Sequence, residues 1–246
     1  MVKTYKFADK IIEIQSIHNQ VHHYCKDYTC EGTPDFSVEI SQSDIEFERK
    51  KSESEFAFEG KKMPNFSNAE LETTAVYRKI AEIMPSFDTI VFHGSVIAVD
   101  GEAFLFTAKS GTGKSTHTRL WRELFGDRTV MVNDDKPLLK ITENSVIAYG
   151  SPYNGKHHLG CNMSAPLKGI CILKRGQENT ISQISKAQAY PMLMQQVYRP
   201  KDGMQLAKVL KLIDRLSQNT SLFELHCNME PEAAKVAYEG MKGVTI

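Results

Sequence analysis

The chain has 246 residues, of which 41% are hydrophobic and 24% charged, which is the composition of an ordinary globular protein. Lys and Arg together number 30, as do Asp and Glu, and this zero net charge argues against nucleic-acid binding through bulk positive charge. The start, MVKTYKFADK, lacks the apolar core of a signal peptide. No apolar run approaches the ~18 residues of a transmembrane helix. None of the five cysteines forms a CxxC pair. We therefore expect a cytoplasmic protein with reduced thiols and without nucleic-acid or membrane partners.

Residues 1–88 are predicted to form a small α/β module. The segments KIIEIQ (Lys10–Gln15) and FSVEI (Phe36–Ile40) alternate apolar and polar residues, as half-buried strands do. Apolar residues recur at helical spacing over Ser67–Met84, and Pro85 follows directly, which predicts a helix that ends there. We expect this module to contribute to the choice of substrate.

Residues 89–246 are predicted to form an α/β catalytic domain with a mixed central sheet. Two β-rich runs, TIVFHGSVIAV and EAFLFTA, flank Asp100–Gly101, a dipeptide that favours a two-residue hairpin turn because both positions tolerate positive φ. The second run leads straight into a glycine-rich loop, so an antiparallel partner precedes that loop. Patterns of the same kind predict further strands at Thr129–Val132, Leu138–Ile141, Val146–Tyr149, Gly169–Leu173 and Leu222–Leu225, and helices at Lys114–Phe125, Met204–Leu216 and Pro231–Met241.

The glycine-rich loop has the sequence AKSGTGKS and fits the phosphate-binding pattern GxxxxGK[ST], with Ala108 in place of the first glycine. Its glycines let backbone N–H groups turn toward phosphate oxygens, and the next helix presents its positive end to the same anion. Lys114 is expected to reach the β- and γ-phosphates, and Ser115 to bind Mg²⁺. The residues predicted to bind ATP are Ser110, Gly111, Thr112, Gly113, Lys114, Ser115 and Thr116. ATPases, GTPases and kinases share this motif, so it does not define the reaction.

An acidic pair, Asp134–Asp135, follows Asn133 at the end of a predicted strand. Carboxylates at such a place commonly meet the Mg²⁺ of a nucleotide, whose preferred ligands are oxygens. One aspartate could hold the metal while the other accepts a proton from an attacking hydroxyl.

His93 lies inside the apolar run IVFHGSV. If the hairpin pairs about Asp100–Gly101, His93 faces Ala108 at the mouth of the glycine-rich loop. The predicted register therefore brings an imidazole near the phosphates or the metal, although a buried structural histidine is the alternative interpretation.

The run FHGSVIAVDGEAFLFTAKSGTGKSTHTRLW, followed by VNDD, resembles the catalytic core shared by HPr kinase/phosphorylase and phosphoenolpyruvate carboxykinase. The resemblance extends over residues 89–175 and implies an HPr kinase/carboxykinase-like fold. It implies that Lys114 binds phosphates, that Ser115 and Asp135 bind Mg²⁺, and that Asp134 is the catalytic base, although the two aspartates could exchange roles. It also implies that His93 contacts the phosphate or a second metal. The segment SPYNGKHHLG (151–160) stands where that family has a second signature loop, which leaves the acceptor open.

Three weaker signals lie outside these motifs. The cluster Lys156–His158 could close over the triphosphate or the acceptor, and Arg199 could act as a lid arginine. His18, His22 and His23 lack the Glu of an HExxH zinc motif, so we expect them on a helix surface.

These observations together predict an ATP- and Mg²⁺-dependent kinase. It would transfer the γ-phosphoryl group to an acceptor hydroxyl, either a serine of a peptide or protein or a small molecule, and a homo-oligomer is compatible with this activity. Two alternatives remain open: a regulatory NTPase whose hydrolysis drives a change of shape, and a carboxykinase-like enzyme that acts on a small keto acid.

Overall fold

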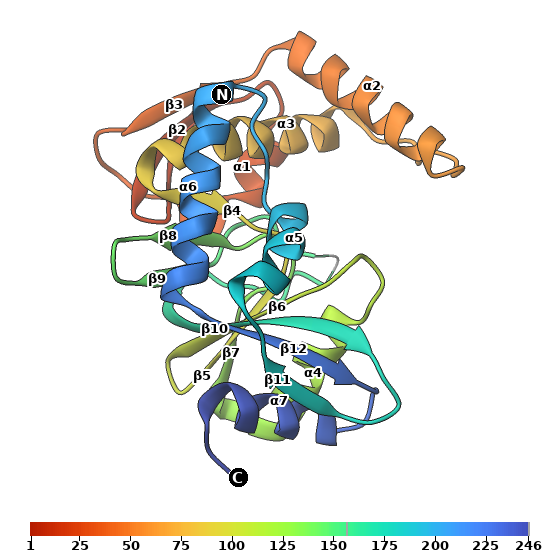
Figure 1. The fold of residues 1–246 in the computed structure, drawn as a ribbon. Coiled ribbons are helices and arrows are strands. Elements are labelled where there is room, and N and C mark those ends of the chain that lie inside the picture. Colours follow the sequence, from red (N-terminus) through yellow and green to blue (C-terminus); the bar gives the residue numbers. More distant parts are fainter. Residues whose placement is uncertain (156, 246) are drawn as a thin grey trace. The chain divides into compact units, whose positions relative to one another are not determined.

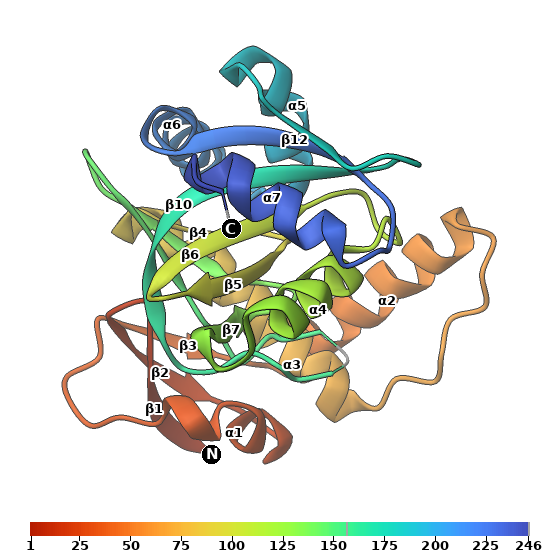
Figure 2. The same cartoon turned by 90° about the horizontal axis from the view of Figure 1, so that it is seen from below.

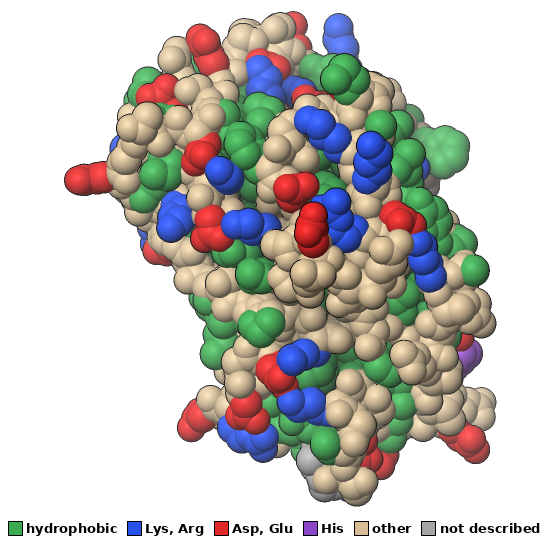
Figure 3. Space-filling view, turned by 60° about the vertical axis from the view of Figure 1, so that its left-hand side comes forward, with side chains coloured by type: hydrophobic (Ala, Val, Ile, Leu, Met, Phe, Trp, Pro, Cys, Tyr) green, Lys and Arg blue, Asp and Glu red, His purple; other side chains and the backbone are tan. Residues whose placement is uncertain are grey.

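A computed structural model describes residues 1–155 and 157–245 of the chain (Figure 1). The chain forms two compact units, Met1–Ile83 and Met84–Ile246, and the boundary that the sequence suggested at residue 88 lies close to this division. Over the described ranges, no helix is both long and apolar enough to cross a membrane. Acidic and basic side chains are interspersed on the face that Figure 3 shows, as the equal numbers of the two kinds in the sequence would suggest.

The first unit contains a three-stranded sheet and three α-helices. Its elements are β1 (Val2–Phe7), β2 (Lys10–Gln15), α1 (Gln20–Tyr24), a 3₁₀ turn (Lys26–Tyr28), β3 (Phe36–Glu39), α2 (Gln42–Phe58) and α3 (Asn68–Ile83). Both predicted strands and the predicted helix are confirmed. Strand β1 was missed because it pairs with β2 through a turn at Ala8–Asp9, where non-glycine residues adopt φ of 47° and 66° and give no turn signal in the sequence.

The expectation that all three N-terminal histidines lie on a surface is wrong for His22. This side chain is only 3% exposed because its ring packs beside Tyr5. The Tyr5 hydroxyl lies 2.7 Å from His22 Nδ1 and the Ser16 hydroxyl 2.9 Å from Nε2, so both ring nitrogens have partners. Burial lowers the pKa of His22, which keeps the imidazole neutral.

The described residues of the second unit form a curled, mixed, nine-stranded sheet. Its strands are β4 (Thr89–Val91), β5 (Ser95–Val99), β6 (Glu102–Thr107), β7 (Thr129–Asn133), β8 (Leu138–Ile141), β9 (Val146–Tyr149), β10 (Ser164–Arg175), β11 (Thr180–Gln183) and β12 (Ser221–Cys227). The strand order is β4-β8-β9-β10-β6-β5-β7, and β12 pairs with β10 and β11. The first part of the long strand β10 pairs with β9, and its later part runs parallel to both β6 and β12. The predicted mixed sheet is thus confirmed.

The α-helices of this unit cover the two faces of its sheet (Figure 2). They are α4 (Lys114–Phe125), α5 (Lys186–Gln196), α6 (Gly203–Asn219) and α7 (Glu232–Lys242), and short 3₁₀ turns lie at Met84–Phe87 and Gly126–Arg128. One core contains buried residues of α5 and α6, and the other contains residues of α4 and α7. Alternate residues of β5 enter the two cores, as the period of a strand requires. Helix α5 was not predicted, since Pro191 interrupts its helical pattern.

The hairpin that precedes the glycine-rich loop is confirmed in its predicted register. Strands β5 and β6 pair antiparallel from Ser95↔Phe106 to Val99↔Glu102. The turn residues Asp100 and Gly101 have φ of 51° and 80°, which explains the Asp-Gly dipeptide. The first β-rich run, however, is two strands. β4 ends at Val91 and pairs with β8, whereas β5 pairs with β6 and β7.

Trp121 packs α4 against the sheet, as the sequence suggested. The side chain is fully buried and contacts the rings of Phe104, Phe106, Phe125 and Tyr238. We expect Trp121→Ala to lower the free energy of unfolding by about 3–5 kcal/mol, because a large cavity remains in the core. Urea unfolding followed by circular dichroism would measure this change. Leu124→Ala, at a position of the same helix that is 41% exposed, is the control, for which we expect a change within about 0.5 kcal/mol. A loss of less than about 1 kcal/mol for Trp121→Ala would contradict this description of the core.

Candidate active site

The glycine-rich loop lies between the end of β6 and the start of α4, so the strand–loop–helix order that the motif requires is present. Gly111 and Gly113 have φ of 76° and 124°, values that L side chains rarely adopt. The Thr112 amide donates to the Lys109 carbonyl over 3.2 Å, which tightens the loop. The first N–H groups of a helix have no partner within it, so the start of α4 offers donors and a positive dipole end to an anion.

Lys114, the first residue of α4, extends back across the loop. Its ammonium group donates to the Ala108 carbonyl over 3.2 Å. Partial burial lowers the pKa of Lys114, and the nearby Asp135 carboxylate acts in the opposite direction. The side chain therefore places a positive charge inside the loop, facing the acidic pair.

Asn133 builds the acidic turn at the end of β7. Its Oδ1 accepts hydrogen bonds from the backbone amides of Asp135 at 2.9 Å and Lys136 at 2.6 Å. Its Nδ2 donates to the hydroxyl and the carbonyl of Ser151 at 3.1 and 3.2 Å. Asn133 is fully buried and fixes the two carboxylates that follow it. Sequence reasoning did not assign this role, although an Asn at a strand end is a recognisable turn signal.

The Asp135 carboxylate lies next to three positive or protonatable groups. Oδ1 is 3.3 Å from His93 Nε2, and Oδ2 is 3.7 Å from Lys136 Nζ. Burial acts to raise the pKa of Asp135, but the hydrogen bond from His93 and the charges of Lys136 and Lys114 outweigh it and hold this pKa below its usual value. The predicted residues His93, Lys114 and Asp135 therefore lie together.

The sequence suggested that His93 lies within a strand. In the structure it lies instead in the break between β4 and β5. Its amide donates to the Gln196 carbonyl over 2.7 Å, and its carbonyl accepts from the Thr107 hydroxyl over 3.0 Å. The Gly94 amide donates to the Asp135 carbonyl over 2.9 Å, which joins this break to the acidic turn. These three bonds place the imidazole beside the end of β6, where the glycine-rich loop begins.

Asp134 occupies a more enclosed position than Asp135 and is only 7% exposed. Its Oδ1 accepts a hydrogen bond from the Gly155 amide over 2.6 Å, and the Ser95 hydroxyl donates to its carbonyl over 3.1 Å. A Cβ atom at position 155 would lie 3.2 Å from Asp134 Oδ2, so glycine permits this close approach.

In the segment 150–161, Gly150 and Gly160 pack tightly against the end of β7, where the acidic turn begins. A Cβ atom on Gly150 would lie 2.8 Å from the Val132 carbonyl oxygen, and one on Gly160 would lie 3.0 Å from Asn133 Cα. Of the basic cluster predicted in this segment, Lys156 lies outside the described residues, and His157 and His158 are exposed. Contact of the cluster with a ligand stays a prediction.

Arg199 is exposed on the segment that follows α5. Val197 forms an isolated bridge with Phe92, and the Tyr198 amide donates to the Val91 carbonyl over 2.9 Å. The backbone of this segment thus borders the break that holds His93, and the lid role of Arg199 stays a prediction.

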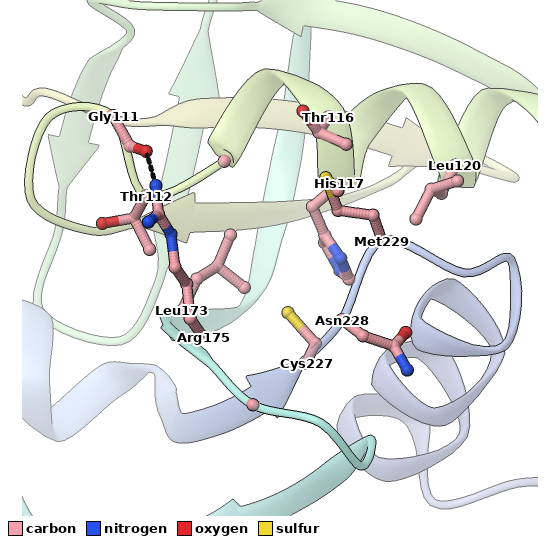
Figure 4. A pocket seen from close by; sticks show the side chains of 12 residues that line it. Gly111, Thr112, Thr116, His117, Leu120, Leu173, Arg175, Cys227, Asn228 and Met229 are labelled. Atoms are coloured by element: carbon pink, nitrogen blue, oxygen red, sulfur yellow. Dashed lines mark hydrogen bonds between the residues drawn. The ribbon is translucent and has the colours of Figure 1, made fainter.

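Arg175, which sequence reasoning missed, lies at the end of β10. Its Nη2 donates to the Gly111 carbonyl over 2.7 Å, as Figure 4 shows. The parallel pairing of β10 with β6, in register Ile172↔Thr107, brings the carboxyl ends of both strands to the same edge of the sheet. The sequence alone gives no sign of this long-range pairing.

The oxygen donors suit a magnesium ion that a nucleotide brings with it. Within residues 1–155 and 157–245, no three His, Cys, Asp or Glu side chains form a metal-binding group. Mg²⁺ is usually bound by one or two carboxylates together with substrate phosphates. The Ser115 hydroxyl, on the exposed first turn of α4, and the Asp135 carboxylate fit this pattern, and their metal roles stay predictions.

The ion pair of Asp135 has a consequence for stability. Since its pKa is lowered in the folded state, the carboxylate stabilises the fold above the unfolded pKa of about 4, and this contribution is lost as the pH falls through the folded pKa. At pH 7 we expect the free energy of unfolding of wild type to exceed that of Asp135→Asn by on the order of 1 kcal/mol. This difference should shrink toward pH 3. Urea unfolding of both proteins across that range would measure it. A difference that stays constant with pH would contradict the proposed pairing.

A family model described as "SynChlorMet cassette protein ScmC" matches residues 63–232, which is more than half of the chain. The chain belongs to the ScmC family. The matched region contains the glycine-rich loop, the acidic turn and His93. A search of curated proteins finds no match. Among solved structures, the HPr(Ser) kinase/phosphatase from Coxiella burnetii is similar, with 15% sequence identity and a TM-score of 0.29 over 52% of this chain and 97% of that chain.

Proposed function

We propose that the chain is an ATP-dependent, Mg²⁺-requiring kinase that transfers the γ-phosphoryl group of ATP to an acceptor hydroxyl. The observation that carries this proposal is the position of the Asp135 carboxylate, which interacts with both His93 and Lys114 at the glycine-rich loop. A phosphate-binding loop alone would suit any nucleotide-binding protein. The acidic pair and the imidazole beside it would supply a metal ligand, a base and a group that contacts the transferred phosphate.

The loop and the start of α4 would hold the triphosphate. Backbone amides of residues 110–116 would donate to its oxygens, and Lys114 would neutralise charge on the β- and γ-phosphates. Lys114 now donates to the neutral Ala108 carbonyl, which phosphate oxygens would replace with stronger, charge-assisted bonds. This exchange favours binding.

Ser115 and Asp135 would hold the magnesium ion. The ion would supply positive charge that offsets negative charge developing on the phosphates during transfer. His93 hydrogen-bonds Asp135 and thereby orients its carboxylate. His93 would also contact an oxygen of the transferred phosphoryl group.

Asp134 would accept the proton of the attacking hydroxyl. The Gly155 amide holds one carboxylate oxygen, Oδ1, so the group has a fixed orientation. The other oxygen, Oδ2, would take the proton as the hydroxyl attacks the γ-phosphorus. Because Asp134 and Asp135 are consecutive residues of one turn, the base and the metal ligand keep a constant separation.

The experiment that tests this function uses ATP labelled at the γ-phosphate. The protein is incubated with labelled MgATP and a cell extract divided by size into small-molecule, peptide and protein fractions. We expect label to be transferred to organic material in one fraction with wild-type protein but not with Asp134→Asn. Label that appears only as inorganic phosphate would instead indicate a hydrolase or a regulatory NTPase.

A further inference from the structure

A cavity of about 540 Å³ adjoins the glycine-rich loop (Figure 4). It lies between α4 and the carboxyl ends of β10 and β12. Apolar side chains form much of its wall, namely Leu120, Leu173, Cys227 and Met229. Its other end is formed by residues of the loop and the first turn of α4, including Gly113 and Thr116. Its volume falls in the range of small-molecule sites, which are mostly apolar with few polar groups.

His117 supplies a buried polar group to this cavity. Its side chain lines the cavity and is only 3% exposed. The Trp121 indole N–H donates to His117 Nε2 over 3.1 Å. An indole nitrogen can only donate, so Nε2 must be the unprotonated acceptor.

The proton of His117 therefore resides on Nδ1. Burial lowers the pKa of His117 to about 3, so the ring is neutral and carries one N–H. Among the described residues, Nδ1 has no hydrogen-bond partner. A buried donor without an acceptor is costly, and a ligand acceptor in the cavity would satisfy it.

We propose that this cavity binds the adenine base of ATP and that His117 donates a hydrogen bond from Nδ1 to a ring nitrogen of the base. This inference rests on the proposed function, because the base is placed by a triphosphate in the adjoining loop. Gly113 and Thr116 border both the loop and the cavity, so the ribose would pass over the first turn of α4. The faces of a purine suit the apolar walls, and its ring nitrogens are the acceptors that the Nδ1–H group lacks.

The first test compares two ligands that share the phosphates but not the base. Calorimetry would measure the affinities of MgATP and of magnesium tripolyphosphate for wild type, His117→Phe and His23→Phe. Phenylalanine keeps an aromatic ring beside Phe106 and Trp121 but removes the donor, and His23 is an exposed histidine of the first unit. We expect His117→Phe to weaken MgATP binding by about 3- to 10-fold and to leave tripolyphosphate binding unchanged. His23→Phe, the control, should bind both ligands as wild type does.

The outcomes separate this inference from the proposed function. If tripolyphosphate binds as tightly as MgATP, or if His117→Phe weakens both ligands equally, the base does not occupy the cavity and the inference is wrong. If neither ligand binds wild type, the proposed function fails as well.

A second test uses the wild-type protein and does not depend on a variant that folds. Cys227 lines the cavity, whereas Cys30 lies in the first unit, and partial burial raises the pKa of both thiols. We expect MgATP to slow maleimide labelling of Cys227 at least about 5-fold and tripolyphosphate to slow it much less. Neither ligand should change the labelling rate of Cys30. Peptide mass spectrometry would measure both sites. Equal labelling of Cys227 with and without MgATP would overturn the inference.

Discussion

Lys114→Met is expected to lower kcat/KM for MgATP by about 10²- to 10³-fold, which corresponds to a loss of roughly 2.7–4 kcal/mol of transition-state stabilisation. The reason is electrostatic. The ammonium group is partly buried, so its interaction with phosphate oxygens is screened less than at the surface. Methionine keeps the unbranched shape of the side chain but removes its charge. Initial rates of phosphoryl transfer, or of hydrolysis before the acceptor is known, would measure the effect.

Lys109→Met is the matched control for this prediction. Lys109 lies in the same loop, but its side chain is exposed. We expect this variant to stay within about threefold of wild type. Since burial disfavours the Lys114 ammonium, Lys114→Met should be at least as stable as wild type, and thermal unfolding would exclude misfolding as the cause of lost activity. Near-normal turnover by Lys114→Met would refute the role of this residue.

Asp134→Asn is expected to lower kcat by about 10²- to 10⁴-fold while MgATP affinity changes little. Asparagine has the same size as aspartate, and its carbonyl oxygen can still accept the Gly155 amide that now bonds to Oδ1. The variant therefore keeps the orientation of the side chain and loses the ability to take a proton. Comparison of kcat with the dissociation constant for MgATP would separate the two effects.

The control for this prediction is Asp127→Asn, because Asp127 is exposed. We expect this substitution to leave both kcat and MgATP affinity unchanged. Asp135→Asn provides a contrast, because loss of the proposed metal ligand should weaken Mg²⁺-dependent binding of ATP. If Asp135→Asn lowers kcat alone and Asp134→Asn weakens Mg²⁺-dependent binding, the roles of the two aspartates must be exchanged.

The features that sequence reasoning predicted correctly are those set by local signals. Asp100–Gly101 encodes the hairpin turn, and that turn fixes the register that brings His93 to the start of the loop. The glycine-rich loop, with the strand before it and the helix after it, also lies in one continuous stretch. Contact between His93 and Asp135 then follows from the pairing of β5 with β7.

The features that sequence reasoning missed depend on pairing between distant segments. Arg175 reaches Gly111 because β10 runs parallel to β6, and no pattern in the sequence encodes that choice of partner. Ser151 supports Asn133 from a separate loop. The protonated nitrogen of His117 follows from its bond to Trp121, which becomes visible only in three dimensions.

The most direct test of the central claim, that one triphosphate lies between the glycine-rich loop and the acidic turn, is hydrogen–deuterium exchange with a non-hydrolysable MgATP analogue. We predict slower exchange in peptides that cover residues 108–116 and 133–136 in wild type, and none of this protection in Lys114→Met. Unchanged exchange in both segments at saturating analogue, or protection confined to other parts of the chain, would contradict the claim.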